Sequence, residues 1–276
     1  MIVSARNKLL NWLVGSKNSI VEINFDVKGR TFKAYVPDDQ YWGSIKDVLL
    51  NREYEYFTDF ELERFTGLVV DAGAHVGLFS LISSIFARYV VAIEPHPANF
   101  RLLKRNFEKN KVSNAFALNK ALYSRNKQRI NLYEGADSGC NSVIKGSNLQ
   151  YIVANSITLQ QIIEDFGNID LLKIDVEGAE FEIFRNIEKN YLTRINAIVG
   201  EIHSAFGRKD KILEELNNKG FSIRTLYPPL LKKGGRYLIN VNDLRRLKLI
   251  RGVLYTVSPI ARAIDKSLLI FFAKRK

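Results

Sequence analysis

The residues from Asp71 to Gly77 spell Asp-Ala-Gly-Ala-His-Val-Gly and directly follow an apolar run. A glycine-rich turn between a buried strand and a helix lets the backbone approach a ligand at the carboxyl edge of a parallel sheet. Glu94 ends the next apolar run, where a carboxylate accepts hydrogen bonds from both hydroxyls of a ribose. Together these features predict a nucleoside-containing cofactor, bound by Asp71, Gly73, His75, Gly77 and Glu94.

Two observations distinguish the kinds of nucleoside cofactor. The dinucleotide fingerprint G-x-G-x-x-G is absent, because counting from Gly73 its later glycines fall on His75 and Leu78. A carboxylate at Asp71 suits a cofactor that carries a positive charge, such as the amino group of a methionine moiety, better than it suits a pyrophosphate. The turn therefore favours S-adenosylmethionine over NAD.

A second group of chemically useful residues lies in the stretch KIDVEGAE, which begins at Lys173 and ends a later apolar run. Strand alternation places Lys173 and Asp175 on one face, and Asp175 is the acid best placed to point into a cleft. Glu177 and Glu180 fall in the first turn of the following helix, where acids also stabilise the helix dipole. Lys173 is either a catalytic group or a partner for these acids.

Glu201 and His203 close the next predicted strand and share one face of it. Methyl transfer to a hydroxyl requires the acceptor to lose its proton, and a histidine with a pKa near 6.5 is a suitable base. His203 is the first candidate for that role. Alternatively, Asp175, Glu201 and His203 hold a Mg²⁺ ion that lowers the pKa of the acceptor hydroxyl, or His203 satisfies only a local hydrogen bond.

The elements that must position these residues alternate along the chain from Leu68. Short runs that are fully apolar are typical of strands covered on both faces, and their alternation with helices predicts βαβ units. We therefore expect an α/β fold with a doubly wound, mostly parallel sheet. The expected strands lie at 68–70, 90–93, 115–122, around 152, 171–175, 197–202, 221–226 and 236–241, and the helices at 76–87, 98–109, after Thr158, at 179–186 and at 208–219.

The regions outside this pattern are an N-terminal extension, a polar loop and a tail. Residues 1–66 hold a predicted amphipathic helix and, at 20–36, a β-hairpin that turns at Lys28-Gly29, before a catalytic domain at 67–243. The stretch 137–142 is either a lid that brings Ser142 to the cofactor or a plain solvated loop. The single cysteine, Cys140, excludes an intramolecular disulfide and indicates an ordinary thiol in a reducing, cytoplasmic setting.

Five motifs of this chain resemble, in order and spacing, those of the FkbM family of S-adenosylmethionine-dependent methyltransferases. They are VVDAGAHVG at 69–77, IEPHP at 93–97, NKAL at 119–122, SITL at 156–159 and DLLKIDVEGAE at 170–180. The resemblance implies a class I Rossmann-like fold and transfer of a methyl group to a hydroxyl of a sugar, glycolipid or secondary metabolite. It also implies that Asp71, Gly73 and Gly77 line the methionine part, Glu94 holds the ribose and Ala121 lies near the adenine. His75 and Gln160 depart from the family pattern.

The positive charge of the chain is concentrated at its end. The net charge is +12, and residues 244–276 contain nine basic residues and one acid. This tail has the pattern of a basic amphipathic helix, which packs on the domain or in a homodimer, lies on an anionic membrane surface, or, least favoured, binds nucleic acid. No apolar run is long enough for a membrane span. We expect a cytoplasmic methyltransferase, peripheral to the inner face of the membrane, with a non-catalytic S-adenosylmethionine-binding or membrane-surface interaction protein as the alternative.

Overall fold

A seven-stranded sheet forms the centre of the computed structural model, which describes residues 20–38, 45–126, 128–133, 142, 150–203, 207–226, 238–240 and 268–276. The strand order is β11-β13-β10-β9-β3-β4-β5. The five strands from β10 to β5 are parallel, whereas β13 runs antiparallel to both of its neighbours. The bounds are β3 Leu68–Ala72, β4 Tyr89–Ile93, β5 Ala115–Leu118, β9 Ile169–Ile174, β10 Ile195–His203, β11 Phe221–Leu226 and β13 Leu268–Arg275.

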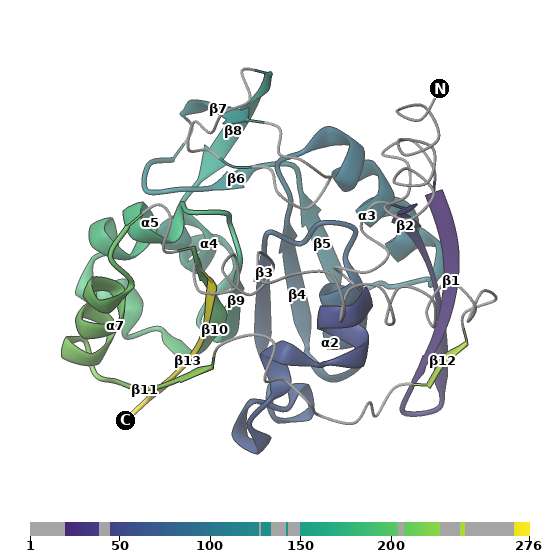
Figure 1. Ribbon diagram of the computed structural model, residues 1–276, viewed down its shortest axis with the longest axis horizontal. Coiled ribbons are helices and arrows are strands. Elements are labelled where there is room, and N and C mark those ends of the chain that lie inside the picture. Colours follow the sequence, from purple (N-terminus) through teal and green to yellow (C-terminus); the bar gives the residue numbers. More distant parts are fainter. Residues whose placement is uncertain are drawn as a thin grey trace, which may run out of the picture.

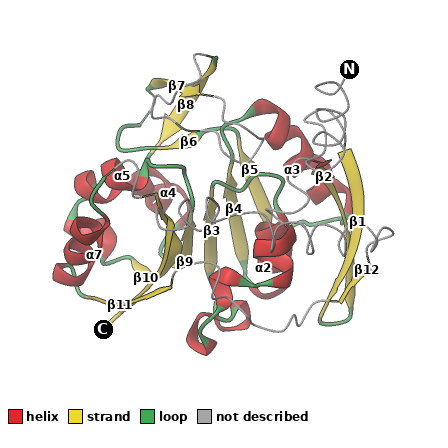
Figure 2. Cartoon of the chain, viewed as in Figure 1, coloured by secondary structure: helices red, strands yellow, loops and turns green. Residues whose placement is uncertain are grey.

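Helices cover both faces of this sheet, so the predicted doubly wound α/β architecture is confirmed (Figures 1 and 2). Along β3, Val69 joins the apolar cluster on one face, and Val70 joins the cluster on the other. Both faces of the sheet are buried from solvent, which explains why the strands are apolar at successive positions. The first face carries α2 (Leu78–Phe86) and α3 (Pro97–Lys109), and the second carries α4 (Leu159–Phe166), α5 (Glu180–Asn186), α6 (Lys189–Leu192) and α7 (Lys209–Asn218).

The chain reverses direction across the sheet between β3 and β9. From β3 it proceeds outward through β4 to β5, and it later returns to place β9 on the other side of β3. At such a switch point the loops at the carboxyl ends of the two strands diverge and leave room for a ligand. The motifs at Asp71 and Lys173 lie on these two strands, which pair in register at those residues.

The predicted hairpin is confirmed as β1 (Ile20–Val27) and β2 (Arg30–Pro37), with β12 (Leu238–Asn240) added beside β1. Its turn uses positive φ angles at Lys28 and Gly29. The side-chain amide of Asn106 in α3 donates to the backbone oxygens of Tyr35 and Val76. Figure 1 shows α3 lying between the hairpin and the central sheet, so the hairpin is an extension of the same domain.

A third, smaller sheet stands beyond the carboxyl edge of the central sheet (Figure 1). It consists of β6 (Ala121–Leu122), β8 (Tyr151–Ile157) and β7 (Arg129–Tyr133). The strand β8 leads to Thr158, whose side-chain oxygen accepts from the Gln161 N–H at 3.1 Å and caps α4, as the sequence predicts.

The prediction of a helix through the C-terminal apolar cluster is wrong, because Leu268–Arg275 form the strand β13 between β10 and β11. Leu269 and Phe271 pack into one face of the sheet, and Ile270 and Phe272 into the other. A strand covered on both faces is apolar at every position, which a short helix also tolerates, so the pattern alone does not separate the two. The rest of the predicted tail, at 244–267, and the predicted N-terminal helix lie outside the described residues. Within the described residues, no helix is long and apolar enough to cross a membrane.

Candidate active site

The glycine-rich turn after β3 presses against the end of β9. Gly73 has φ +76°, and a Cβ atom placed there would lie 1.7 Å from the backbone oxygen of Asp175. Gly77, with φ +85°, begins α2 so close to α3 that a Cβ would lie 2.3 Å from Leu103 Cδ1. Both positions therefore require glycine, for the backbone angle and for the close approach.

Glu94 lies beyond the end of β4 with its carboxylate turned to the same loop. It accepts hydrogen bonds from the backbone N–H groups of His75 (2.8 Å) and His96 (2.9 Å). The residue is only 5% exposed, and burial raises the pKa of its carboxyl to about 7, although the hydrogen bonds oppose that rise. Its oxygens retain lone pairs for further donors, such as ribose hydroxyls.

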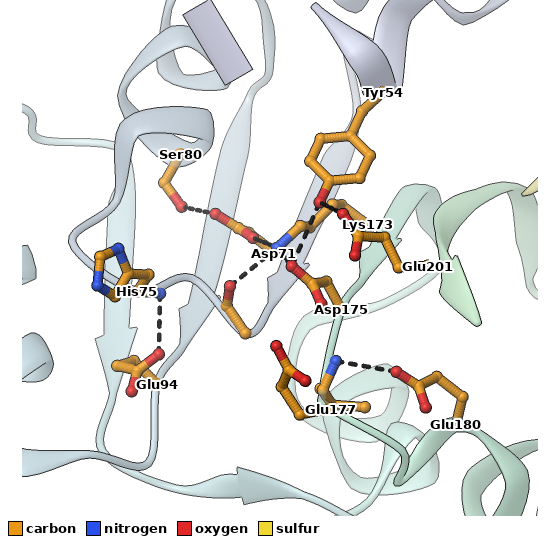
Figure 3. Close-up of polar contacts among 12 residues, drawn as sticks. Tyr54, Asp71, His75, Ser80, Glu94, Lys173, Asp175, Glu177, Glu180 and Glu201 are labelled. Atoms are coloured by element: carbon orange, nitrogen blue, oxygen red, sulfur yellow. Dashed lines mark hydrogen bonds and ion pairs between the residues drawn. The ribbon is translucent and has the colours of Figure 1, made fainter. Parts of the chain in front are cut away.

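Lys173 is the buried cation that ties the glycine-rich turn to β9. Its ammonium donates to the backbone oxygen of Gly73 at 2.8 Å and lies 3.4 Å from Asp71 Oδ1 and 3.5 Å from Asp175 Oδ2 (Figure 3). The Ser80 hydroxyl donates to Asp71 Oδ2 at 2.6 Å. Burial lowers the pKa of Lys173, but the surrounding carboxylates raise it more, so the residue stays charged. Asp71 is fully buried between Ser80 and Lys173.

Tyr54 comes from the N-terminal extension and reaches the ends of β9 and β10 (Figure 3). Its hydroxyl lies 2.9 Å from Glu201 Oε1 and 3.3 Å from Asp175 Oδ2. Burial and the two negative charges raise the pKa of the Tyr54 hydroxyl, so it remains a hydrogen-bond donor. The 3₁₀ helix Glu53–Glu55 that carries Tyr54 is held by a buried ion pair of 2.6 Å between Arg52 and Glu55.

His203 lies among carboxylates from three elements. Its Nδ1 is 3.1 Å from Glu180 Oε1, and its Nε2 is 3.3 Å from Glu177 Oε2, 3.7 Å from Glu201 Oε2 and 4.0 Å from Asp175 Oδ1. Burial lowers the pKa of His203, but these carboxylates raise it to about 10. At this pKa His203 is protonated at neutral pH and has no electron pair with which to accept a proton.

Among the described residues, one group lies close enough together to hold a metal ion, and it differs by one residue from the predicted set. Single ligand atoms of Asp175, Glu177 and His203 all lie within 4.8 Å of one another. Glu177 joins Asp175 and His203 in this group, while Oε1 of Glu201 lies 2.9 Å from the Tyr54 hydroxyl and its Oε2 lies 3.7 Å from His203 Nε2. Burial and the charge of Asp175 raise the pKa of Glu201 to about 8.

The two remaining predicted site residues lie in or beside the small sheet. Ala121 is buried in β6, opposite Ser156. The Ser142 hydroxyl donates to the backbone oxygen of Glu177, and its backbone pairs with Tyr133. Ser142 thus connects the small sheet to the loop after β9, whereas residues 137–141, including Cys140, lie outside the described residues.

Comparison with known proteins identifies the family to which this chain belongs. The methyltransferase FkbM domain matches residues 71–223, more than half of the chain. The chain belongs to the FkbM methyltransferase family. It is therefore an S-adenosylmethionine-dependent methyltransferase, and its fold is the class I Rossmann-like fold. The match begins at Asp71 and includes every predicted site residue.

Curated relatives of this FkbM-family methyltransferase come from fungi and bacteria. Methyltransferase 1 of Beauveria bassiana is 26% identical over 209 residues, which cover 66% of this chain and 82% of that protein. The 31-O-demethyl-FK506 methyltransferase FkbM of Streptomyces tacrolimicus is 24% identical over 196 residues, covering 59% and 75%. Solved structures similar to the chain include the precorrin-6y methyltransferase of Geobacter metallireducens (TM-score 0.38, 13% identity, 78% of this chain and 83% of that one). They also include the 16S rRNA methyltransferase RsmC of T. thermophilus (TM-score 0.46, 13% identity, 93% and 51%).

Sequence reasoning missed two residues that this FkbM-family methyltransferase brings to the site, Tyr54 and Glu53. Both stand in the aromatic and acidic stretch EYEYF, which has neither strand nor helix periodicity. Burial and the negative charges of Asp47, Glu201 and Asp175 raise the pKa of the Glu53 carboxyl. The available signal was an acid-rich segment immediately before the first strand of the domain, but no spacing rule links it to β9 or β10.

Proposed function

We propose that this FkbM-family methyltransferase transfers the methyl group of S-adenosylmethionine to a hydroxyl oxygen of a small-molecule acceptor. The observation that carries the proposal is the cluster of carboxyl groups at the ends of β9 and β10, where Asp175 and Glu201 share the Tyr54 hydroxyl. A hydroxyl acceptor has a proton to lose, and carboxylate oxygens orient that proton by accepting its hydrogen bond. One relative is named for a methyltransferase acting on an O-demethyl compound, which also favours oxygen.

The other half of the site suits the adenosyl part of the cofactor. Glu94 is fixed by two N–H donors of the chain and keeps acceptor capacity for ribose hydroxyls. The glycines let the turn after β3 pack closely against the end of β9 and against α3, beside the switch point. The proposed cofactor-binding residues are Gly73, His75, Gly77, Glu94, Ala121 and Ser142, whereas the fully buried Asp71 supports the turn through Lys173 and Ser80.

The chain's part in the reaction is to hold the acceptor and to manage one proton. When bound, S-adenosylmethionine supplies a methyl group on a positively charged sulfur, so that a carbon–oxygen bond replaces the carbon–sulfur bond. Asp175, whose side chain is 25% exposed, faces the acceptor and receives the hydroxyl proton. Lys173 holds Asp175 in place through its ion pair, and Nε2 of His203 lies 4.0 Å from Asp175 Oδ1. Asp175 is thus the proposed proton acceptor, and Lys173 and His203 are proposed to position it as positively charged neighbours.

We infer that the acceptor carries several hydroxyls, as a sugar, a glycolipid or a polyhydroxylated secondary metabolite does. Carboxyl groups from three elements, Glu53, Asp175 and Glu201, act on one another at this place, which suits neighbouring hydroxyls as donors. This hypothesis rests on the match between the carboxyl groups of the site and the hydroxyl donors of such a compound. It is tested by comparing methyl transfer to acceptors with one and with several hydroxyls.

The test is transfer of a labelled methyl group from S-adenosylmethionine to panels of hydroxyl, amine and carbon acceptors. We expect methylation of a hydroxyl compound, and a loss of turnover of about 10²–10⁴-fold in Asp175→Asn with unchanged S-adenosylhomocysteine binding. Glu182→Gln, an exposed carboxyl that pairs with Arg185, is the matched control and should keep full turnover. Methylation of amines alone would contradict the proposal.

We also propose that a lipid-linked acceptor is reached from the cytoplasmic face of the membrane through the basic residues of 244–267. Basic side chains near an anionic surface each add to the attraction, so charge reversal at Arg245, Arg246, Lys248 and Arg251 should release the protein from phosphatidylserine vesicles. Deleting 244–276 is not a usable test, because it removes β13 from the central sheet. Equal vesicle binding by the charge-reversed protein would refute the idea.

A further inference from the structure

We propose that Asp175, Glu177 and His203 bind one divalent cation of the Mn²⁺ type, with Glu180 holding His203 in the ligating orientation. The cation's use in catalysis rests on the proposed transfer to a hydroxyl, whereas the binding site itself stands on the geometry. An acceptor hydroxyl beside such a cation loses its proton more readily.

The ligand atoms have the separations that one ion requires. Metal–ligand distances of about 2.1 to 2.2 Å place neighbouring ligand atoms of an octahedral ion about 3 Å apart and opposite ones about 4.3 Å apart. Nε2 of His203 lies 3.3 Å from Glu177 Oε2 and 4.0 Å from Asp175 Oδ1, and all three atoms lie within 4.8 Å of one another. The three side chains are therefore close enough to approach one ion by small side-chain movements.

The second line of argument is the support behind His203. Glu180 is fully buried, its Oε1 accepts from the backbone N–H of Val176 at 3.2 Å, and the same oxygen lies 3.1 Å from His203 Nδ1. A neutral imidazole that donates from Nδ1 to this carboxylate presents the lone pair of Nε2 to Asp175 and Glu177. Metal-ligating histidines almost always have such a carboxylate or carbonyl partner on the other nitrogen.

An independent observation is the buried carboxyl of Glu53. It is 5% exposed, and among the residues that the structure describes it has neither a hydrogen-bond nor an ion-pair partner. The carboxyls that act on it include Asp175 and Glu201, so it faces the cluster from the side of the N-terminal extension. Lys173 is the cation that acts on Glu53, and burial raises the pKa of the Glu53 carboxyl, so a water molecule on the proposed ion would give this carboxyl a further hydrogen-bond partner.

The backbone of Glu177 points to the same place. Glu177 has φ 52°, in the left-handed region that disfavours residues with a Cβ atom, and Gly178 follows with φ 99°. The Ser142 hydroxyl donates to the Glu177 backbone oxygen and helps to hold this turn. The conformation turns the Glu177 carboxylate to within 3.3 Å of His203.

The donor set selects among cations. One imidazole nitrogen and two carboxylates suit a first-row divalent ion, whereas Mg²⁺ prefers oxygen ligands alone and keeps several waters. We therefore expect Mn²⁺ to bind more tightly than Mg²⁺, which differs from the Mg²⁺ expected from the sequence.

The test is titration of the full chain with Mn²⁺, in the presence of S-adenosylhomocysteine, followed by loss of the free-ion paramagnetic resonance signal. Wild type should bind one equivalent, and His203→Ala should lose binding. Glu180→Gln should weaken it about 10–100-fold, as loss of an outer partner does. Glu182→Gln, on the exposed side of α5, is the control and should bind as wild type does. Equal affinity in wild type and His203→Ala would overturn the proposal.

A second variant separates lost ligation from unfolding. Glu177→Gly removes the carboxylate but relieves the left-handed backbone, so we expect loss of Mn²⁺ binding with no decrease in the urea midpoint. Retained Mn²⁺ affinity in this variant would overturn the assignment of Glu177.

Methyl transfer after EDTA treatment distinguishes this inference from the proposed function. If the protein binds no Mn²⁺ and methyl transfer is undiminished, the proposed metal site is refuted, whereas the proposed transfer to a hydroxyl is not. One equivalent of Mn²⁺ bound without methylation of any hydroxyl would support the site and count against the proposed function.

Discussion

Glu94→Gln should remove a pH dependence that Glu94 gives to cofactor binding. Burial raises the pKa of this carboxyl to about 7, and its charged form is the one that accepts hydrogen bonds from two ribose hydroxyls. With a pKa near 7, about one-tenth of the carboxyl is ionised at pH 6 and about nine-tenths at pH 8. If only the carboxylate binds well, the affinity of wild type for S-adenosylhomocysteine rises about tenfold between these pH values.

The same shift predicts a stability effect of known sign. Because the pKa of Glu94 is higher in the folded protein than its ordinary value of 4.5, the folded state binds the proton more tightly. Its contribution is fully present below pH 4.5 and is lost as the pH rises through about 7. The size is about 3 kcal/mol, an order-of-magnitude figure from 1.36 kcal/mol per pKa unit.

Isothermal titration calorimetry with S-adenosylhomocysteine at pH 6, 7 and 8 measures the first effect. Urea unfolding over a wider series, from about pH 4.5 to pH 8, measures the second, because most of the change falls below pH 6. Glu94→Gln should bind S-adenosylhomocysteine weakly, since the amide has only one acceptor oxygen and its NH₂ group faces one of the two backbone N–H donors. Its affinity should not change with pH, because an amide does not titrate over this range. Glu182→Gln controls for loss of a surface carboxyl. A Glu94→Gln protein whose affinity still rises tenfold with pH would refute the reasoning.

Three further substitutions test the elements that position the site. Gly73→Ala should abolish S-adenosylhomocysteine binding in calorimetry and lower the urea midpoint more than Gly29→Ala does. Both glycines have similar positive φ angles, but only a Cβ atom at residue 73 strikes Asp175. Equal midpoints in the two variants would show that the close approach is unimportant. Lys173→Met should cost about 3–5 kcal/mol in urea unfolding, because it leaves buried carboxylates without their cation, and a loss under 1 kcal/mol would contradict the network. Thr158→Ala should cost about 1 kcal/mol through the lost cap of α4, with cofactor affinity unchanged; a drop in affinity would mean that the small sheet transmits the change.

Much of the sheet was predictable because local sequence controls it. Short apolar runs that alternate with segments of helical periodicity identify β3, β4, β9 and β10 as strands. The Lys28-Gly29 turn identifies the hairpin. The strand β13 was not predictable, because LLIFFA has no polar alternation and its neighbours β10 and β11 end 42 or more residues before it begins. Only pairing with them makes it a strand.

The residues of the candidate site also fall into those that local sequence predicts and those that only the packing of distant segments reveals. The sequence by itself determined the loop residues whose role depends on their own strand end, such as Gly73, Glu94 and Asp175, because parallel strands bring their carboxyl ends to one edge. Tertiary structure alone decided the partners of those residues. Tyr54 and Glu53 join Asp175 across more than 100 residues, and Glu177 as well as Glu201 lies beside His203. Periodicity fixes the face from which a side chain leaves its strand, whereas the groups it meets depend on how distant segments pack.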